Sequence, residues 1–122
     1  MTENNISIAE AFYAAMGGKN IARMEQYVHP NIQFRGPLAE VTGKEEYLEV
    51  VKNFMDFFKT LTVRAKFGSE DQAMLVYDVE FPAPIGNCPS AALMTFKENL
   101  IIKVELFYDA RPFEKLKDEI FS

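Results

Sequence analysis

The sequence of 122 residues contains no tryptophan, one cysteine and one histidine, and none of its apolar runs approaches the roughly 20 residues of a membrane-spanning helix. A single cysteine, Cys88, cannot form a disulfide within the chain, and His29 alone cannot build the usual zinc site. Residues 1–9 include the acidic Glu3 and no basic stretch, which is unlike a secretory signal. We therefore expect a cytoplasmic protein that uses no metal and no cofactor.

Positive charge is also scarce. Thirteen basic residues stand against 18 acidic ones, which gives a net charge of −5. An acidic chain is poorly suited to bind nucleic acid or an anionic membrane, so we expect neither as a partner. Hydrophobic residues make up 48% and charged residues 25%, as in ordinary folded proteins. The length predicts a single domain over residues 1–122.

Two helices are predicted at the start of the chain. Over residues 5–16 apolar side chains recur at helical spacing, and the two glycines that follow end the helix. Asn20 is a typical N-cap for a second helix that runs to about Val28. The pair His29-Pro30 stops that helix, because the residue before a proline is pushed out of helical geometry.

A short strand over residues 31–37 leads to a longer helix. Thr42 and Glu45 have the spacing of a capping box, which predicts where this helix begins. From Tyr47 to Leu61 apolar residues share one face and charged residues the other, which is typical of a helix packed on a sheet.

The second half of the chain predicts antiparallel strands. Alternating or β-rich segments lie at residues 62–67, 73–81, 90–97 and 100–108. Asn99 tolerates the positive φ of a tight turn between the last two strands, and a helical tail is expected over residues 113–121. Helices followed by an antiparallel meander predict an α+β fold with the helices on one side of the sheet.

The last strand indicates self-association. Alternate residues give it a wholly apolar face, which consists of Leu100, Ile102, Val104, Leu106 and Tyr108. Its other face mixes Ile101 and Phe107 with charged residues. Because a half-apolar second face is often covered by a partner subunit, we expect a homodimer.

Several segments together resemble the nuclear transport factor 2-like (NTF2-like) superfamily, closest to its SnoaL-like, polyketide cyclase-like branch. They are Ala-Phe-Tyr at 11–13, Tyr-Val-His-Pro-Asn-Ile-Gln-Phe at 27–34, Gly-Lys-Glu-Glu-Tyr at 43–47, Phe-Lys-Glu-Asn-Leu-Ile at 96–101 and Glu-Leu-Phe-Tyr-Asp at 105–109. The resemblance implies a cone in which a curved sheet wraps three helices around a deep pocket. Because this fold carries enzymes and binding proteins alike, it does not decide the function.

The resemblance also implies positions for catalytic residues. In the ketosteroid isomerase branch a tyrosine and two aspartates correspond to Phe12, Gly36 and Ala92, so the side chains for that reaction are missing here. Tyr13 can replace the tyrosine only if the register shifts by one residue. In the cyclase-like branch the general acid corresponds to Asp109, at the end of the last strand.

Asp78 and Glu80 are candidate acids on the strand over residues 73–81. Their i, i+2 spacing puts both on one face, and inside an apolar pocket desolvation and mutual repulsion would raise a carboxyl pKa toward neutrality. The alternative is that this face is solvated and the other face packs in the core. That other face consists of Ala73, Leu75, Tyr77, Val79 and Phe81.

Other polar residues also have two interpretations. Tyr13 is either a hydrogen-bond donor to a ligand or a core residue with a satisfied hydroxyl. Asp109 is either a pocket acid or a partner of Arg111. His29 fits a helix C-terminal cap, and Arg35 fits either an anion clamp or an ion pair.

Besides a purely structural dimer with a filled cone, two classes of function remain open. The leading hypothesis is a pocket for a small apolar organic molecule, with cofactor-independent isomerase, cyclase or hydratase chemistry carried by Asp78, Asp109 and Tyr13. The alternative is a non-catalytic module of the same fold that binds a small ligand or a protein. An enzyme of the first class needs a carboxyl group that titrates near neutral pH and responds to ligand.

Overall fold

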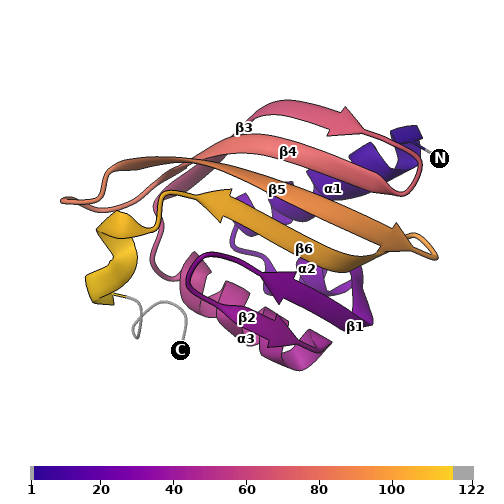
Figure 1. Ribbon diagram of the computed structural model, residues 1–122, viewed down its shortest axis with the longest axis horizontal. Helices are drawn as coiled ribbons and strands as arrows, with labels where there is room; N and C mark the ends of the chain where they lie inside the picture. The colour runs from indigo at the N-terminus through magenta and orange to yellow at the C-terminus, as the bar shows by residue number, and fades with distance from the viewer. Residues whose placement is uncertain (1, 117–122) are drawn as a thin grey trace.

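The computed structural model describes the backbone of residues 2–116 and the side chains of residues 5–113 (Figure 1). Its helices are α1 (Thr2–Gly17), α2 (Ile21–Glu25), α3 (Lys44–Met55) and the 3-10 helix η1 (Arg111–Leu116). Its strands are β1 (Val28–Arg35), β2 (Glu40–Thr42), β3 (Thr60–Gly68), β4 (Gln72–Glu80), β5 (Asn87–Lys97) and β6 (Leu100–Tyr108).

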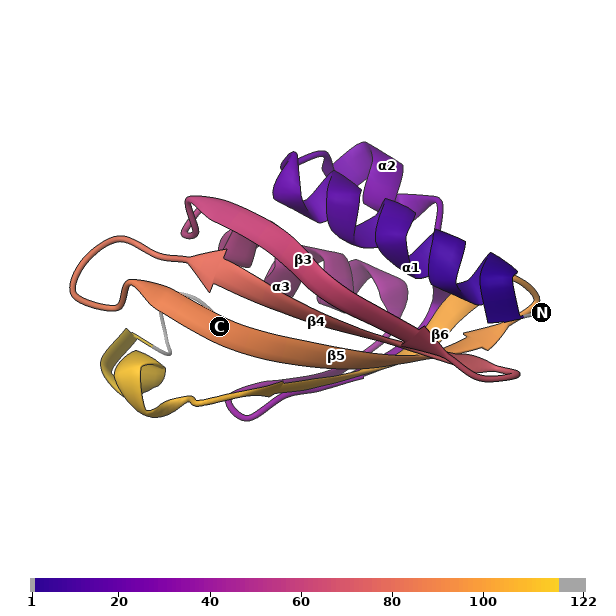
Figure 2. The same cartoon turned by 90° about the horizontal axis from the view of Figure 1, so that it is seen from above.

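The six strands form one curved sheet in the order β2-β1-β6-β5-β4-β3. Neighbouring strands are antiparallel except β1 and β6, which are parallel, so the sheet is mixed. The three α-helices lie on one side of it, which we call the inner face (Figure 2). The other side is the outer face. This arrangement confirms the α+β fold that the sequence predicts.

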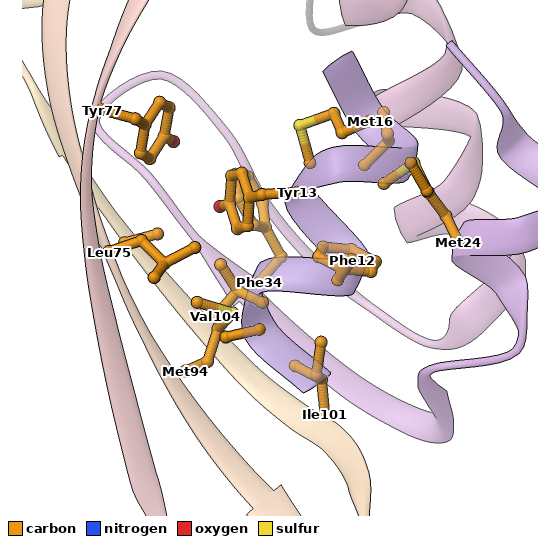
Figure 3. Close-up of a cluster of buried hydrophobic side chains, with 14 of the residues drawn as sticks. Phe12, Tyr13, Met16, Met24, Phe34, Leu75, Tyr77, Met94, Ile101 and Val104 are labelled. Carbon is orange, nitrogen blue, oxygen red and sulfur yellow. The ribbon is translucent and has the colours of Figure 1, made fainter. Parts of the chain in front are cut away.

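The inner face and the helices enclose an apolar core. Alternate residues of β4 and β5 point into it, as a half-buried strand requires. Phe12, Met24, Leu75, Met94 and Ile101 are completely buried there (Figure 3). The prediction that alternate residues of β4 face the core is therefore confirmed.

Helix starts were predicted with mixed success. Asn20 is the N-cap of α2, and its side chain accepts a hydrogen bond from the Arg23 amide at 3.1 Å. The predicted capping box at Thr42 and Glu45 is wrong, because Thr42 belongs to β2 and pairs with Gln33. The N-cap of α3 is Gly43, which makes no side-chain cap bond and adopts φ 102°, a conformation that favours glycine.

Helix ends differ more from the sequence pattern. α2 ends at Glu25 and β1 already begins at Val28, so His29 lies in a strand and is not a helix cap. α3 ends at Met55, six residues before Leu61, which lies in β3. The helical periodicity continued through this junction because the residues after α3 also pack on the core. Most of the predicted tail helix, residues 117–121, lies outside the described residues.

A bulge in β6 changes which residues face the core. Thr95 pairs with Lys103, but Phe96 pairs with Ile101, so the register shifts between these pairs. Because one extra residue switches the alternation, Ile101 is fully buried while Ile102 is only partly buried. The prediction that Ile101 lies on the less apolar face is therefore wrong, whereas Val104 lies in the core as expected.

Candidate ligand cavity

A cavity with a volume of about 50 Å³ lies between the inner face and helices α1 and α3. That volume holds a few water molecules, since one water needs about 10–15 Å³ by the same kind of measure. Most of the wall is aromatic, with contributions from Tyr13, Phe34, Tyr47, Phe54, Tyr77, Phe81, Tyr108 and Phe113. The cavity is therefore an apolar chamber whose polar groups are mainly tyrosine hydroxyls.

Tyr13 is the sequence-predicted site residue that lines this cavity. It extends from α1 toward β4, is only 2% exposed, and its ring centroid lies 4.9 Å from that of Tyr77 (Figure 3). The two hydroxyl groups are hydrogen-bonded. Burial raises the pKa of Tyr13 to about 12, and the bond to Tyr77 offsets part of that rise. At neutral pH the group is therefore a hydrogen-bond donor or acceptor, not a base.

The hydroxyl pair can serve a ligand. Two hydroxyl groups that share one hydrogen bond use one of their two protons, which leaves the second proton free to donate. Burial also raises the pKa of Tyr77 well above its usual range, and Tyr13 adds to this effect by its hydrogen bond and its charge when ionised. Both protons therefore stay in place at neutral pH, and the pair presents one donor to the cavity.

Tyr47 and Met16 complete the inner wall. The Tyr47 ring stacks on Phe12 with centroids 6.4 Å apart and packs at 5.4 Å from Phe34, so α3 is held against α1 and β1. Met16 lies one helical turn beyond Tyr13 on α1. Its unbranched thioether chain can change rotamer at low cost, which makes this part of the wall adaptable.

Asp78 lies on the outer face of β4 and not in the cavity. Its carboxylate pairs with the Arg64 guanidinium at 3.3 Å and accepts a hydrogen bond from Asn87 at 3.4 Å. Glu80, two residues along the same face, is exposed. Tyr77 and Val79 line the cavity from the opposite face of the strand. The alternation that puts the acids outside is therefore the correct interpretation of this strand.

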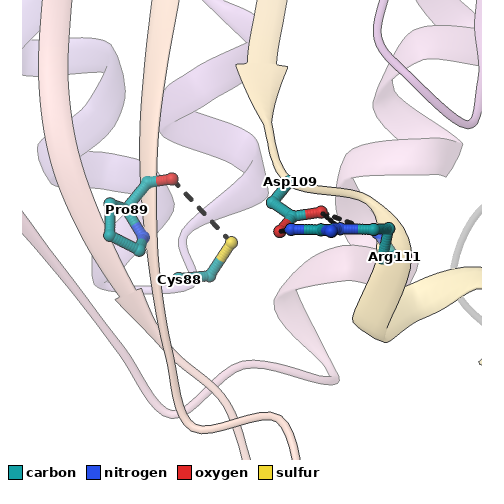
Figure 4. Close-up of polar contacts among 4 residues, drawn as sticks. All are labelled: Cys88, Pro89, Asp109 and Arg111. Atoms are coloured by element: carbon teal, nitrogen blue, oxygen red, sulfur yellow. Dashed lines mark hydrogen bonds and ion pairs between the residues drawn. The ribbon is translucent and has the colours of Figure 1, made fainter.

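Asp109 lies just after β6, where the chain turns into η1. Its carboxylate accepts hydrogen bonds from the Arg111 side chain at 2.7, 2.9 and 3.2 Å and from the Arg111 amide at 3.0 Å (Figure 4). The Arg111 contacts lower the pKa of Asp109 to about 2. Asp109 is exposed and stays ionised at neutral pH, so it has the properties of an ion-pair partner and not of a general acid.

Cys88 and Ser90 line the cavity from β5, and the sequence analysis did not place them there. The Ser90 hydroxyl donates to the Cys88 carbonyl at 3.3 Å, and the thiol lies 3.9 Å from the Pro89 carbonyl (Figure 4). Burial raises the pKa of the Cys88 thiol, which disfavours a nucleophilic thiolate. The sequence predicts a strand that begins at Ser90, whereas β5 begins at Asn87. With the earlier start, the alternation of the strand places the side chains of Cys88 and Ser90 on its inward face.

The remaining candidates lie away from the cavity. His29 accepts a hydrogen bond from the Asn31 amide at 3.0 Å, and Arg35 forms an exposed ion pair with Glu40 at 3.3 Å. Among the described residues, no three His, Cys, Asp or Glu side chains gather as metal ligands would. No charged side chain lines the cavity within the part of the chain whose side chains are described.

The fold places this protein in a known class. At a TM-score of 0.77, it is similar to an NTF2-like protein of unknown function from Cytophaga hutchinsonii, with 21% identity over 87% of this chain and 90% of that one. Residues 9–104 match the SnoaL-like domain, so the chain belongs to the SnoaL-like family within the NTF2-like superfamily. The resemblance in the sequence is thereby confirmed.

Other solved structures share the fold at low identity. A protein from Kribbella flavida aligns at a TM-score of 0.85 with 23% identity over 93% of both chains. A steroid delta-isomerase from Pseudomonas aeruginosa aligns at 0.80 with 13% identity over 96% of this chain and 88% of that one. No curated protein matches. Within the described residues, no helix is long and apolar enough to cross a membrane.

The structure also tests the residue correspondence with the isomerase branch. Phe12 and Ala92, which take the positions of a catalytic tyrosine and aspartate in an ungapped reading, are fully buried and do not line the cavity. Tyr13 does line it. The first helix therefore supplies a tyrosine to the cavity one residue later than the sequence comparison placed it, and the two aspartates have no counterpart among the cavity residues.

Proposed function

We propose that this protein binds a small, uncharged and mainly apolar organic molecule in the cavity, with one ligand oxygen accepting a hydrogen bond from the Tyr13–Tyr77 hydroxyl pair. The observation that carries the proposal is the chemistry of the wall, which is aromatic and aliphatic, with tyrosine hydroxyls as its main polar groups and no charged side chain among the described residues. A charged ligand would be buried there without a counter-ion, which is strongly unfavourable.

The ligand must displace part of the wall to fit. An engineered cavity of about 150 Å³ is known to hold benzene, whereas the present cavity measures about 50 Å³. Met16 on α1 is the part of the wall that can move at least cost, because its unbranched thioether chain changes rotamer easily. Molecules of the size of a substituted benzene suit this site better than rigid polycyclic ones.

The wall chemistry favours binding over isomerase, cyclase or hydratase activity. Those reactions need a base beside the ligand, and the predicted bases, Asp78 and Asp109, are engaged with arginines outside the cavity. Tyr13 is the one predicted catalytic residue that a bound ligand can touch. A role for it in positioning or polarising a ligand carbonyl is the part of the enzyme hypothesis that the geometry supports.

A pair of probes tests the proposal. Fluorine NMR titrations would compare 4-fluoroacetophenone, whose carbonyl accepts a hydrogen bond, with fluorobenzene, which lacks that acceptor. We expect both to bind and the ketone to bind more tightly by roughly 3–10-fold, the equivalent of one neutral hydrogen bond. Tyr13→Phe should reduce this preference, although Tyr77 can retain part of it, and Tyr13→Phe with Tyr77→Phe should abolish it.

The control is Asp78→Asn, on the outer face of the strand that carries Tyr77. This variant should bind both probes as the wild type does. Absence of binding by both probes, or equal affinity for them in the wild type, contradicts the proposal. A larger loss of probe binding in Asp78→Asn than in the tyrosine variants would instead support a carboxylate at the ligand site.

We also propose that the chain forms a homodimer. The outer face of the sheet supports this, because partly exposed apolar side chains run across its centre on four strands. Monomeric proteins rarely leave a large apolar patch in contact with water.

A further inference from the structure

Three adjacent strands of the inner face each bring one hydroxyl side chain to the cavity. In the strand pairings Ser90 of β5 lies opposite Tyr77 of β4 on one side and opposite Tyr108 of β6 on the other. All three residues line the cavity, and we call them the hydroxyl row. The backbones of its two tyrosines are two strand spacings apart, or about 10 Å. A ligand in the cavity can therefore meet polar groups at two separate places.

The two ends of the hydroxyl row have different surroundings. At the β4 end, Tyr77 is hydrogen-bonded to Tyr13, and the charge of Tyr13 when ionised also raises the pKa of Tyr47. At the β6 end, burial raises the pKa of Tyr108 well above its usual range, and the nearby Cys88 adds to this rise. The cavity therefore has, besides the Tyr13–Tyr77 pair, a distinct hydroxyl group on β6 that stays protonated at neutral pH.

The hydroxyl group of Tyr108 is available to a ligand. Within the part of the chain whose side chains are described, every fully buried side-chain oxygen has a hydrogen-bond partner, whereas the Tyr108 hydroxyl has none. This hydroxyl is therefore not fully buried, and a small molecule can reach it. The Tyr108 ring packs edge-on against Phe113 with the two centroids 5.5 Å apart, which holds the ring at the cavity wall.

The β6 end suits a ligand hydroxyl better than a ligand carbonyl. The Ser90 hydroxyl donates to the Cys88 carbonyl at 3.3 Å, so its proton is used while its oxygen can still accept. Tyr108 can both donate and accept, and a ligand hydroxyl does the same, whereas a carbonyl only accepts. A carbonyl is better placed at the Tyr13–Tyr77 pair, because a deeply buried donor gains more from a partner than one that water can reach.

We propose that the ligand is a neutral aromatic molecule with oxygen groups at both ends of its ring, a carbonyl held by the Tyr13–Tyr77 pair and a hydroxyl held by Tyr108. The inference rests on the proposed function and narrows its ligand class to hydroxyaryl carbonyl compounds. Tyr108 is then the residue that determines this specificity. Without it, the ligand hydroxyl would enter an apolar cavity with no donor to replace water, which weakens binding.

Two probes of nearly equal size test the role of Tyr108. 4-Hydroxyacetophenone and 4-methylacetophenone differ only in a hydroxyl group in place of a methyl group, and at pH 6 that hydroxyl group is protonated. In NMR titrations the wild type should bind the hydroxyl probe at least as tightly as the methyl probe. In Tyr108→Phe the hydroxyl probe should bind about 10-fold more weakly, because its hydroxyl group is left unpaired, while the methyl probe should keep its affinity.

Tyr27→Phe is the matched control. Tyr27 lies between α2 and β1, packs partly buried against the core and does not line the cavity. Its variant removes the same hydroxyl group and should leave the affinities of both probes unchanged. Ring signals of carbon-13-labelled tyrosines locate the contact, since those of Tyr108 can be assigned by their loss in Tyr108→Phe. They should shift more with the hydroxyl probe than with the methyl probe.

The outcomes separate this inference from the proposed function. If neither probe binds to the wild type, both fail. If both probes bind but the wild type prefers the methyl probe, the hydroxyl group has no partner in the cavity and the Tyr108 subsite is overturned. The subsite is also overturned if Tyr108→Phe weakens both probes equally or neither of them. These last results would leave ligand binding at the Tyr13–Tyr77 pair intact.

Discussion

The buried tyrosines should make the free energy of unfolding fall as the pH rises into the alkaline range. Tyr13, Tyr47 and Tyr77 are each at most 3% exposed, and burial raises the pKa of all three, with that of Tyr13 at about 12. In the unfolded chain the same groups ionise near pH 10. The stabilisation is therefore complete below pH 10 and is lost as the pH rises from 10 toward the native pKa values.

The expected magnitude follows from the number of retained protons. Each tyrosine that stays protonated only in the folded state lowers the free energy of unfolding by about 1.4 kcal/mol per pH unit. Three of them give a slope of about 4 kcal/mol per pH unit between pH 10 and pH 12. Over these two pH units the loss amounts to about 8 kcal/mol, a large part of the roughly 5–15 kcal/mol by which domains of this size are stable. The protein should therefore be strongly destabilised by pH 12.

The variant Tyr13→Phe removes one of the three titrating hydroxyl groups and so measures its contribution to the pH dependence. Urea denaturation followed by circular dichroism at a series of pH values from 9 to 11.5 should show a slope shallower than that of the wild type by about 1.4 kcal/mol per pH unit. Phe12→Leu is the control, because it weakens the core next to Tyr13 without removing a titratable group, and should shift the curve without changing its slope. Equal slopes for Tyr13→Phe and the wild type would refute the burial of this hydroxyl in the folded state.

Three further predictions concern the fold and the turn after β6. Ile101→Ala should lower the free energy of unfolding by about 2–5 kcal/mol in urea titrations, because the bulge buries this side chain completely, and a loss below 0.5 kcal/mol would contradict the register shift. Gly43→Ala should destabilise by about 1 kcal/mol or more in thermal melts, since φ 102° is unfavourable for alanine, and unchanged stability would argue against this N-cap conformation. NMR of the carboxyl carbon should give Asp109 a pKa near 2 in the wild type and near its ordinary value in Arg111→Ala. The stability from this pair is present above about pH 4 and is lost as the pH falls toward 2. An unchanged pKa of Asp109 in the variant would exclude the ion pair as the cause of the low value.

Much of the fold was predictable because it follows local patterns. Alternation in β4 correctly separated Tyr77 from Asp78, and Asn99 has φ 65° in the tight turn before β6. The bulge at Ile101 was not predictable in this way, because it is a property of the pairing between two strands. The early end of α3 was hidden because the residues that follow it are also apolar and pack on the same core.

The candidate site was harder to predict than the fold. Helical spacing placed Tyr13 on the inward face of α1, but its bond to Tyr77 joins residues 64 positions apart and has no local signal. The prediction that Asp78 is a catalytic acid had a related weakness. Asp78 lies in a β-strand next to cavity residues, and only the direction of its side chain, toward Arg64, separates it from them.

The most direct test of the account is a methyl NMR titration with 4-fluoroacetophenone. Val79 and Met16 line the cavity, whereas Val76 and Met74 lie on the outer face of the same sheet and serve as matched internal controls. The account predicts that the methyl signals of Met16 and Val79 move on ligand addition while those of Met74 and Val76 stay in place. Movement confined to Met74 and Val76 would contradict it, because the ligand would then bind on the wrong side of the sheet.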